Sequence, residues 1–181
     1  MTLINIKTNW EKAATELKSE LGVKNVMALP KLKAVSINVG LGANRQNKDM
    51  VAYIAGSLAK VTGQKAVPTV AKKAISSFKL RSGEQVGLRV TLRGDKMYDF
   101  VNRLLNVSLP RIRDFRGIDA KSFDKQGNLT IGFKDQVAFV ELGHDGLDKP
   151  FGVEITFTIK NSNPQHSEAL LKSLGFPMKT S

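Results

Sequence analysis

The chain has 181 residues, a formal net charge of +12 and a pI near 10.0, so excess positive charge is its main compositional feature. Hydrophobic residues make up 41% and charged residues 24%, proportions typical of a folded protein rather than a disordered basic tail. The absence of cysteine excludes disulfides, thiolate zinc sites and cysteine nucleophiles, and with two histidines we expect no metal or cofactor. The charge predicts a polyanionic partner, either nucleic acid or a membrane surface.

The N-terminal segment carries charged residues throughout and has no unbroken apolar core. It is therefore expected to be neither a secretion signal nor a membrane anchor. No segment approaches the roughly 20 apolar residues that are needed to span a bilayer. We expect a cytoplasmic protein that does not contact a membrane.

The pattern of apolar residues predicts helices and strands in a mixed order. Apolar positions in residues 9–21 and 48–62 recur every three or four residues, as in amphipathic helices. Gly22 and Gly63 are expected to end these two helices. A basic loop or hairpin is expected between the second and third strands. Alternation of apolar and polar residues predicts strands at 33–40, 66–70, 86–92, 129–133 and 153–159.

Two further helices follow from capping residues. Asp95 stands at an N-cap position, and the helix after it is expected to end before Pro110. Asn163 is expected to cap a last helix, which Gly175 ends. Helices and strands that do not strictly alternate indicate the α+β class. We expect a single domain over residues 1–181, with a mostly antiparallel sheet, helices packed on one face and the other face open for RNA.

The positive charge is concentrated in the central third of the chain. Lys60 to Arg116 contains thirteen Lys or Arg against four Asp or Glu, whereas residues 117–159 contain four against seven. A solvated basic face is the plainer interpretation. RNA binding instead needs cations for phosphates, small polar groups for riboses and base edges, and planar side chains for stacking. This third, with one residue from outside it, supplies all three kinds: cations Lys65, Lys72, Lys73, Lys79, Arg81, Arg89, Arg93 and Lys96, polar residues Asn38, Gln64, Ser76, Ser77 and Thr91, and the aromatic Phe78.

No arrangement in the sequence points to catalysis. Residues 38–42 follow a strand, but Arg45 replaces the third glycine of a nucleotide-binding loop, so a tight turn is favoured. Asp95 and Asp99 lie four residues apart, where acids more often complement the helix dipole than catalyse. An RNA-processing or nucleotide-acting enzyme is one alternative function. A membrane-surface binder is another, but it would need a basic amphipathic helix.

Three arginines after Pro110 allow two interpretations. Arg111, Arg113 and Arg116 could clamp phosphates, or they could form a salt-bridged turn with Asp114. The sequence leaves both open.

Five segments carry a resemblance to a known family. They are KNVMALPKL (24–32), INVGLG (37–42), the run from TGQ to FRG (62–117), KSFDKQGNLTIGFKDQ (121–136) and LLKSLGFP (170–177). In this order and spacing they resemble the L5 family of universal large-subunit ribosomal proteins, in its bacterial form. The match covers most of the chain, and residues 88–117 are its most specific part.

The resemblance implies a structural component of the large ribosomal subunit that is not an enzyme. Its family binds 5S rRNA with the open side of an antiparallel sheet and helps to place it in the central protuberance. The implied partners also include 23S rRNA and neighbouring large-subunit proteins. Family positions implicated in 5S rRNA binding match Asn38, Gln64 and Thr91. With the nearby cations, the predicted rRNA-binding residues are Asn38, Gln64, Lys65, Arg89, Thr91 and Arg93.

The resemblance also implies separate roles for two loops. The basic loop, residues 71–85, reaches the tRNA in the peptidyl site. The bridge loop, residues 134–150, reaches a protein of the small-subunit head and forms an intersubunit bridge. Residues 139–144 depart from the family's usual pattern, which affects the detailed bridge contacts. The predicted residues are Lys72, Lys73, Ser76, Ser77, Phe78, Lys79 and Arg81 in the basic loop, and Val140, Glu141, His144 and Asp145 in the bridge loop.

Overall fold

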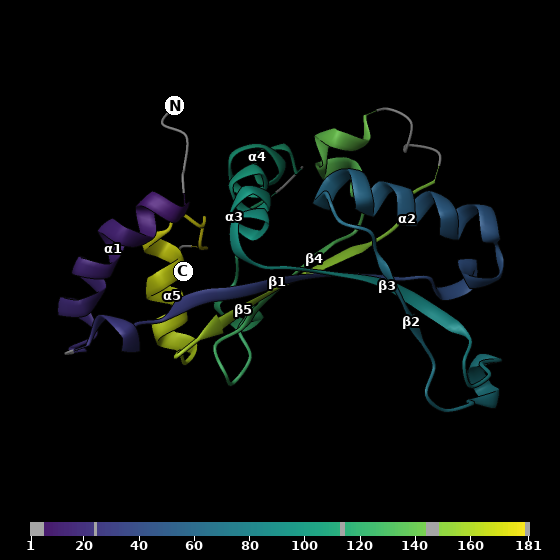
Figure 1. Cartoon of the computed structure of the whole chain (residues 1–181), viewed down its shortest axis with the longest axis horizontal. Coiled ribbons are helices and arrows are strands. Elements are labelled where there is room, and N and C mark those ends of the chain that lie inside the picture. The colour runs from purple at the N-terminus through teal and green to yellow at the C-terminus, as the bar shows by residue number, and fades with distance from the viewer. Residues whose placement is uncertain (1–5, 24, 113–114, 144–148, 180–181) are drawn as a thin grey trace. The chain divides into compact units, whose positions relative to one another are not determined.

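The computed structural model describes residues 6–23, 25–112, 115–143 and 149–179 (Figure 1). Five strands form one antiparallel sheet in the order β2-β3-β1-β5-β4, which confirms the predicted α+β class. All five predicted strands are present. The strands are β1 (Lys31–Gly40), β2 (Val67–Val70), β3 (Gln85–Leu92), β4 (Leu129–Phe133) and β5 (Val153–Lys160). The helices are α1 (Ile6–Glu20), α2 (Lys48–Thr62), α3 (Gly94–Arg103), α4 (Leu109–Arg111) and α5 (Pro164–Ser173).

The chain divides into two compact units, and the prediction of a single domain over residues 1–181 stays a prediction. The first unit comprises residues 1–35, 92–131 and 155–181, and the second unit comprises residues 36–91 and 132–154.

In the second unit, α2 covers one face of the sheet (Figure 1). Its apolar stripe, which includes Ile54 and Leu58, is buried, and so are the alternate residues Ile37 and Leu88 of the strands. The helix has the predicted bounds because each end is capped. The Asn47 side chain accepts hydrogen bonds from the backbone N–H groups of the first turn, and Gly63 ends the helix with a φ of 66°.

In the first unit, α1 contacts both α5 and α3. Phe157 of β5 is fully buried and meets Phe176 edge to face, with ring centroids 5.3 Å apart. The predicted cap of the last helix is confirmed, because Asn163 accepts the N–H of His166 at 2.8 Å. At the other end, Gly175 N–H donates to Lys172 and Phe176 N–H donates to Leu171, a Schellman motif.

The helical chain does not stop before Pro110, so that prediction is wrong. α3 passes into a π-helical turn, Leu104–Ser108, and α4 then includes Pro110. In the wider turn the N–H of Leu109 donates to Leu104, five residues back. The side-chain amide of Asn106 donates to the Asn102 carbonyl at 2.8 Å. The helix therefore continues through Pro110 after its hydrogen bonds have changed from a four-residue to a five-residue spacing.

Asp95 is not the N-cap of α3, which corrects a second prediction. Arg93 occupies that position, without a side-chain hydrogen bond. Asp95 lies in the first turn, where its carboxylate is 3.2 Å from Nζ of Lys7. Asp95 therefore pairs with a lysine of α1 rather than with the backbone of its own helix.

Candidate nucleic-acid interface

Among the described residues of the second unit, no helix covers the sheet face opposite α2, which is here called the open face. Side chains alternate along a strand, so burying Ile37 and Val39 of β1 directs Ser36 and Asn38 to the opposite side. In β3 the same alternation places Arg89 on the open face. The residues of β1 and β3 on this face include Ser36, Asn38, Gly87, Arg89 and Thr91, and of these all but Gly87 are half-buried or exposed.

The edge strand β2 extends the open face. It pairs antiparallel with β3 in a register that sets Val67 opposite Arg89 and Thr69 opposite Gly87. A β-carbon on Gly87 would lie 2.8 Å from Oγ1 of Thr69 and 2.9 Å from the Val39 carbonyl oxygen. Gly87 therefore lets the three strands approach closely beneath the face.

Two side-chain hydrogen bonds order the polar groups of this face. The Asn38 amide donates to Oε2 of Glu154 at 3.3 Å, and the Arg89 guanidinium donates to Oγ of Ser36 at 3.2 Å. Sequence reasoning did not select Ser36, Thr69 or Glu154. The alternation of polar and apolar residues along β1 and β5 could have identified Ser36 and Glu154. Placing Thr69 requires knowledge of the β2–β3 register.

The turn after α2 brings Gln64 next to the backbone of β3. The hydroxyl of Thr62 accepts the N–H of Gln64 at 3.2 Å and donates to the Leu58 carbonyl at 2.7 Å, which fixes the turn. From there the Gln64 amide lies 3.5 Å from the carbonyl oxygen of Thr91. Asn38, Gln64 and Thr91, which lie far apart in the sequence, thus all belong to the second unit.

The predicted cations lie in both units. Lys65 and Arg89 belong to the second unit and are exposed, and Arg93 is the exposed N-cap residue of α3 in the first unit. Among the residues that the structure describes, none of the three has a carboxylate within 4.0 Å. Their charges are therefore not neutralised by those residues.

The basic loop joins β2 to β3 as an ordered hairpin. At its base the N–H of Ala71 donates to the Glu84 carbonyl at 2.9 Å, and near its tip Ile75 and Leu80 pair at 2.9 and 3.1 Å. Between them lies the short 3₁₀ turn Ser76–Phe78. All seven predicted tRNA-facing residues of this loop are exposed, and the ring of Phe78 belongs to a residue that is 69% exposed.

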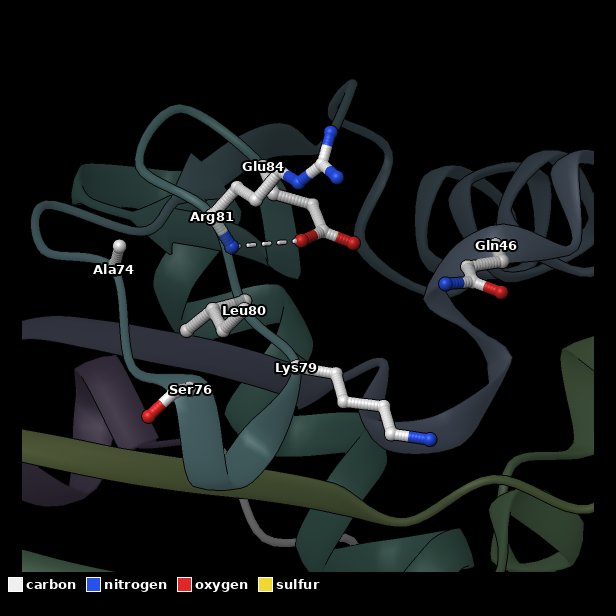
Figure 2. Close-up of a pocket in the computed structure, with 7 residues that line it drawn as sticks. All are labelled: Gln46, Ala74, Ser76, Lys79, Leu80, Arg81 and Glu84. Carbon is white, nitrogen blue, oxygen red and sulfur yellow. Dashed lines mark hydrogen bonds between the residues drawn. The ribbon is translucent and has the colours of Figure 1, made fainter.

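A groove of about 860 Å³ lies beside this loop, and Figure 2 shows the side chains that line it. Glu84 lies in it and has a pKa below the ordinary carboxyl value, chiefly because the backbone N–H of Arg81 and the Arg45 side chain donate hydrogen bonds to its carboxylate. Glu84 is therefore ionised at neutral pH. The groove is lined by Gln46, Ala74, Ser76, Lys79, Leu80, Arg81 and Glu84.

The bridge loop is described only in part. Val140 is 44% exposed and Glu141 is half-buried, both in the 3₁₀ turn Val140–Leu142, while His144 and Asp145 lie outside the described residues. The buried Gln136 closes the base of the loop. Its amide donates to the Lys149 carbonyl at 3.2 Å, and its oxygen accepts the Phe151 N–H at 2.9 Å.

The arginines after Pro110 keep both interpretations open. Arg111 and Arg116 are exposed, while Arg113 and Asp114 lie outside the described residues.

Within the described ranges, no group of three His, Cys, Asp or Glu side chains could hold a metal ion. No helix of those ranges has the length and apolar character required to cross a membrane.

Comparison with known proteins covers nearly the whole chain. Residues 85–178 match the family model for the C-terminus of the ribosomal L5 family, and residues 25–81 match that of ribosomal protein L5. Three relatives carry the name large ribosomal subunit protein uL5. That of Desulforamulus reducens is 49% identical over 89% of both chains. That of Heliobacterium modesticaldum is 46% identical, over 93% of this chain and 96% of its own, and that of Francisella tularensis subsp. mediasiatica 42%, over 94% and 95%.

Proposed function

Because the chain belongs to the ribosomal protein L5 family and is thereby a structural protein of the large ribosomal subunit, not an enzyme, we propose that it works there by binding 5S rRNA with its open face. Its process is translation, and its compartment is the cytoplasm, with the ribosome. By this proposal the protein helps to hold 5S rRNA in the central protuberance, next to 23S rRNA and neighbouring proteins.

One observation carries the 5S rRNA proposal. The face of the second unit that α2 does not cover presents Asn38 and Thr91 together with the exposed Arg89, and Gln64 lies next to the backbone of Thr91. Amide and hydroxyl groups can hydrogen-bond to riboses and base edges, and the guanidinium can hold a phosphate. The hydrogen bond between Asn38 and Glu154 can be replaced by a bond from Asn38 to RNA, because both side chains are accessible to solvent.

We expect 5S rRNA binding to depend strongly on salt. If three or four of the exposed cations contact phosphates, the affinity should fall by about 40- to 150-fold between 50 and 200 mM salt, because each contact releases a counterion. Filter binding of the full chain to 5S rRNA across this range measures the slope. An unrelated RNA of similar length is the control. Equal affinity for both RNAs at the higher salt would reject 5S rRNA as the specific partner.

We propose separately that the basic loop contacts tRNA in the peptidyl site. The loop presents four exposed cations and an exposed aromatic ring on an ordered hairpin. These are the groups that bind phosphates and stack on bases.

The bridge loop, with Val140 exposed at its surface, is proposed to contact a protein of the small-subunit head.

Neutralising the basic loop should affect tRNA and spare 5S rRNA. Changing Lys72, Lys73, Lys79 and Arg81 to glutamine removes four charges from the loop and none from the open face. Retention of peptidyl-site tRNA on assembled ribosomes is expected to fall by about tenfold. Filter binding to 5S rRNA is expected to stay within about twofold of the unmodified chain, because the two surfaces use different residues.

The matched control neutralises four exposed lysines outside both surfaces, Lys12, Lys18, Lys125 and Lys179. This variant has the same net charge as the loop variant. If the two variants lose tRNA to the same extent, the loop has no special role and only the total charge matters.

A further inference from the structure

One arginine outside the basic loop bonds to three places within it. Arg45 lies in the 3₁₀ turn Gly42–Gln46, which connects β1 to α2. Its Nε donates to Oε1 of Glu84 at 2.9 Å. One terminal nitrogen donates to the carbonyl oxygens of Phe78 at 3.0 Å and Lys79 at 2.8 Å. A residue more than 30 positions away in the sequence therefore ties the tip of the hairpin to its base.

These bonds surround the strained residue of the loop. Lys79 has a φ of 50°, a left-handed conformation that residues with a side chain rarely adopt. The Phe78 and Lys79 carbonyls belong to the peptide groups on either side of it. By holding both groups, the guanidinium stabilises the turn that the lysine disfavours. The planar fork of arginine can donate in these directions at once, whereas the single ammonium of lysine cannot match it.

The same arginine forms an ion pair with the only acidic side chain of the basic loop. Within residues 71–85 the sole carboxylate is that of Glu84. One of its oxygens accepts from Arg45 and the other from the backbone N–H of Arg81 at 3.1 Å. The Arg45 and Glu84 side chains are only 17% and 28% exposed, so water screens this pair less than a surface ion pair. Figure 2 shows the Lys79 and Arg81 side chains leaving the loop in separate directions.

We propose that Arg45 is a positioning residue, which holds the basic loop in a preformed conformation with its cations directed outward for RNA. The role of this fixed loop in RNA binding rests on the proposed tRNA contact. The effect of Arg45 on the conformation of the loop can be measured in the free protein. A preformed loop loses less conformational entropy on binding than one that must order itself.

The test compares Arg45→Lys with Lys48→Ala, a control that changes an exposed cation three residues away. Amide hydrogen exchange of the free full-length protein, followed by NMR, reports on Ile75, Lys79 and Leu80, whose N–H groups donate within the loop. Arg45→Lys keeps the charge and should speed exchange at these amides by about tenfold. The buried residues of β3 should exchange as before, which shows that the fold is intact. Lys48→Ala should change neither set.

Unchanged amide exchange at these three residues in Arg45→Lys would overturn the inference, because a positive charge at position 45 would then be enough to hold the loop. Assembled ribosomes give a second readout. Arg45→Lys should reduce retention of peptidyl-site tRNA and leave 5S rRNA affinity within about twofold. Faster exchange with unchanged retention would reject the positioning role if the loop-neutralised variant loses tRNA. If that variant retains tRNA too, the tRNA contact itself is rejected, while the hold of Arg45 on the loop stands.

Discussion

Replacing Asn38 and Thr91 together with alanine is expected to weaken 5S rRNA binding by about a hundredfold, the largest loss from side chains on the open face. Each change removes polar atoms that can bond to the RNA, and one such bond contributes on the order of 1 kcal/mol, or about five- to tenfold. The RNA groups left without a partner at a dehydrated interface add to the loss. Filter binding at one fixed salt concentration measures it.

The fold should survive this double change, since both side chains are half-buried and not part of the core. Circular dichroism and the midpoint of thermal unfolding should match those of the unmodified chain. Asn44→Ala, an exposed asparagine in the turn after β1, is the matched control and should bind normally. If the double variant binds like the control at the same salt concentration, the open face is not the 5S rRNA site.

Changing Gly87 to alanine is expected to lower the free energy of unfolding by about 2 kcal/mol. The new methyl group would lie 2.9 Å from the Val39 carbonyl oxygen and 2.8 Å from Oγ1 of Thr69. The threonine can rotate, but the carbonyl belongs to the backbone of a neighbouring strand, so the strands must shift. Urea unfolding gives the stability change. Because the shift lies under the open face, 5S rRNA affinity should fall as well.

Gly40→Ala is the control for this change. Gly40 ends β1 in the same unit, and a β-carbon there would meet nothing within 4 Å. Its stability and RNA binding should stay close to those of the unmodified chain. Equal stability of the two alanine variants would mean that the close approach at Gly87 costs nothing.

Periodicity and caps predicted most elements of the fold because those signals are local. The strand alternation in 86–92 needed no knowledge of the partner strands, and Asn163 acts within a single helical turn. One error came from a distant contact, because Asp95 meets Lys7 of another helix. The other is local, because the π-helical turn before Pro110 has no signature in residue propensities.

The candidate site divides in the same way. Alternation placed Arg89 and Thr91 on one face of their strand, and Asn38 and Gln64 were selected as small polar residues, which the family resemblance also implicates. No sequence signal placed Arg45 against Glu84, 39 positions apart, because that contact depends on how the turn after β1 meets the hairpin. The approach of Thr69 to Gly87 likewise follows from strand register.

The β2–β3 hairpin carries part of the open face in its strands and the basic loop at its tip. A change in loop length that keeps the pairing of Ala71 with Glu84 would keep the β2–β3 register, so it would alter how far the tip extends without moving Arg89 or Thr91. A one-residue slip of β3 against its neighbours would instead send both side chains to the helix-covered side. The reach of the loop and the chemistry of the face can therefore change independently. Insertions in such proteins should be tolerated in the loop and excluded from the strands.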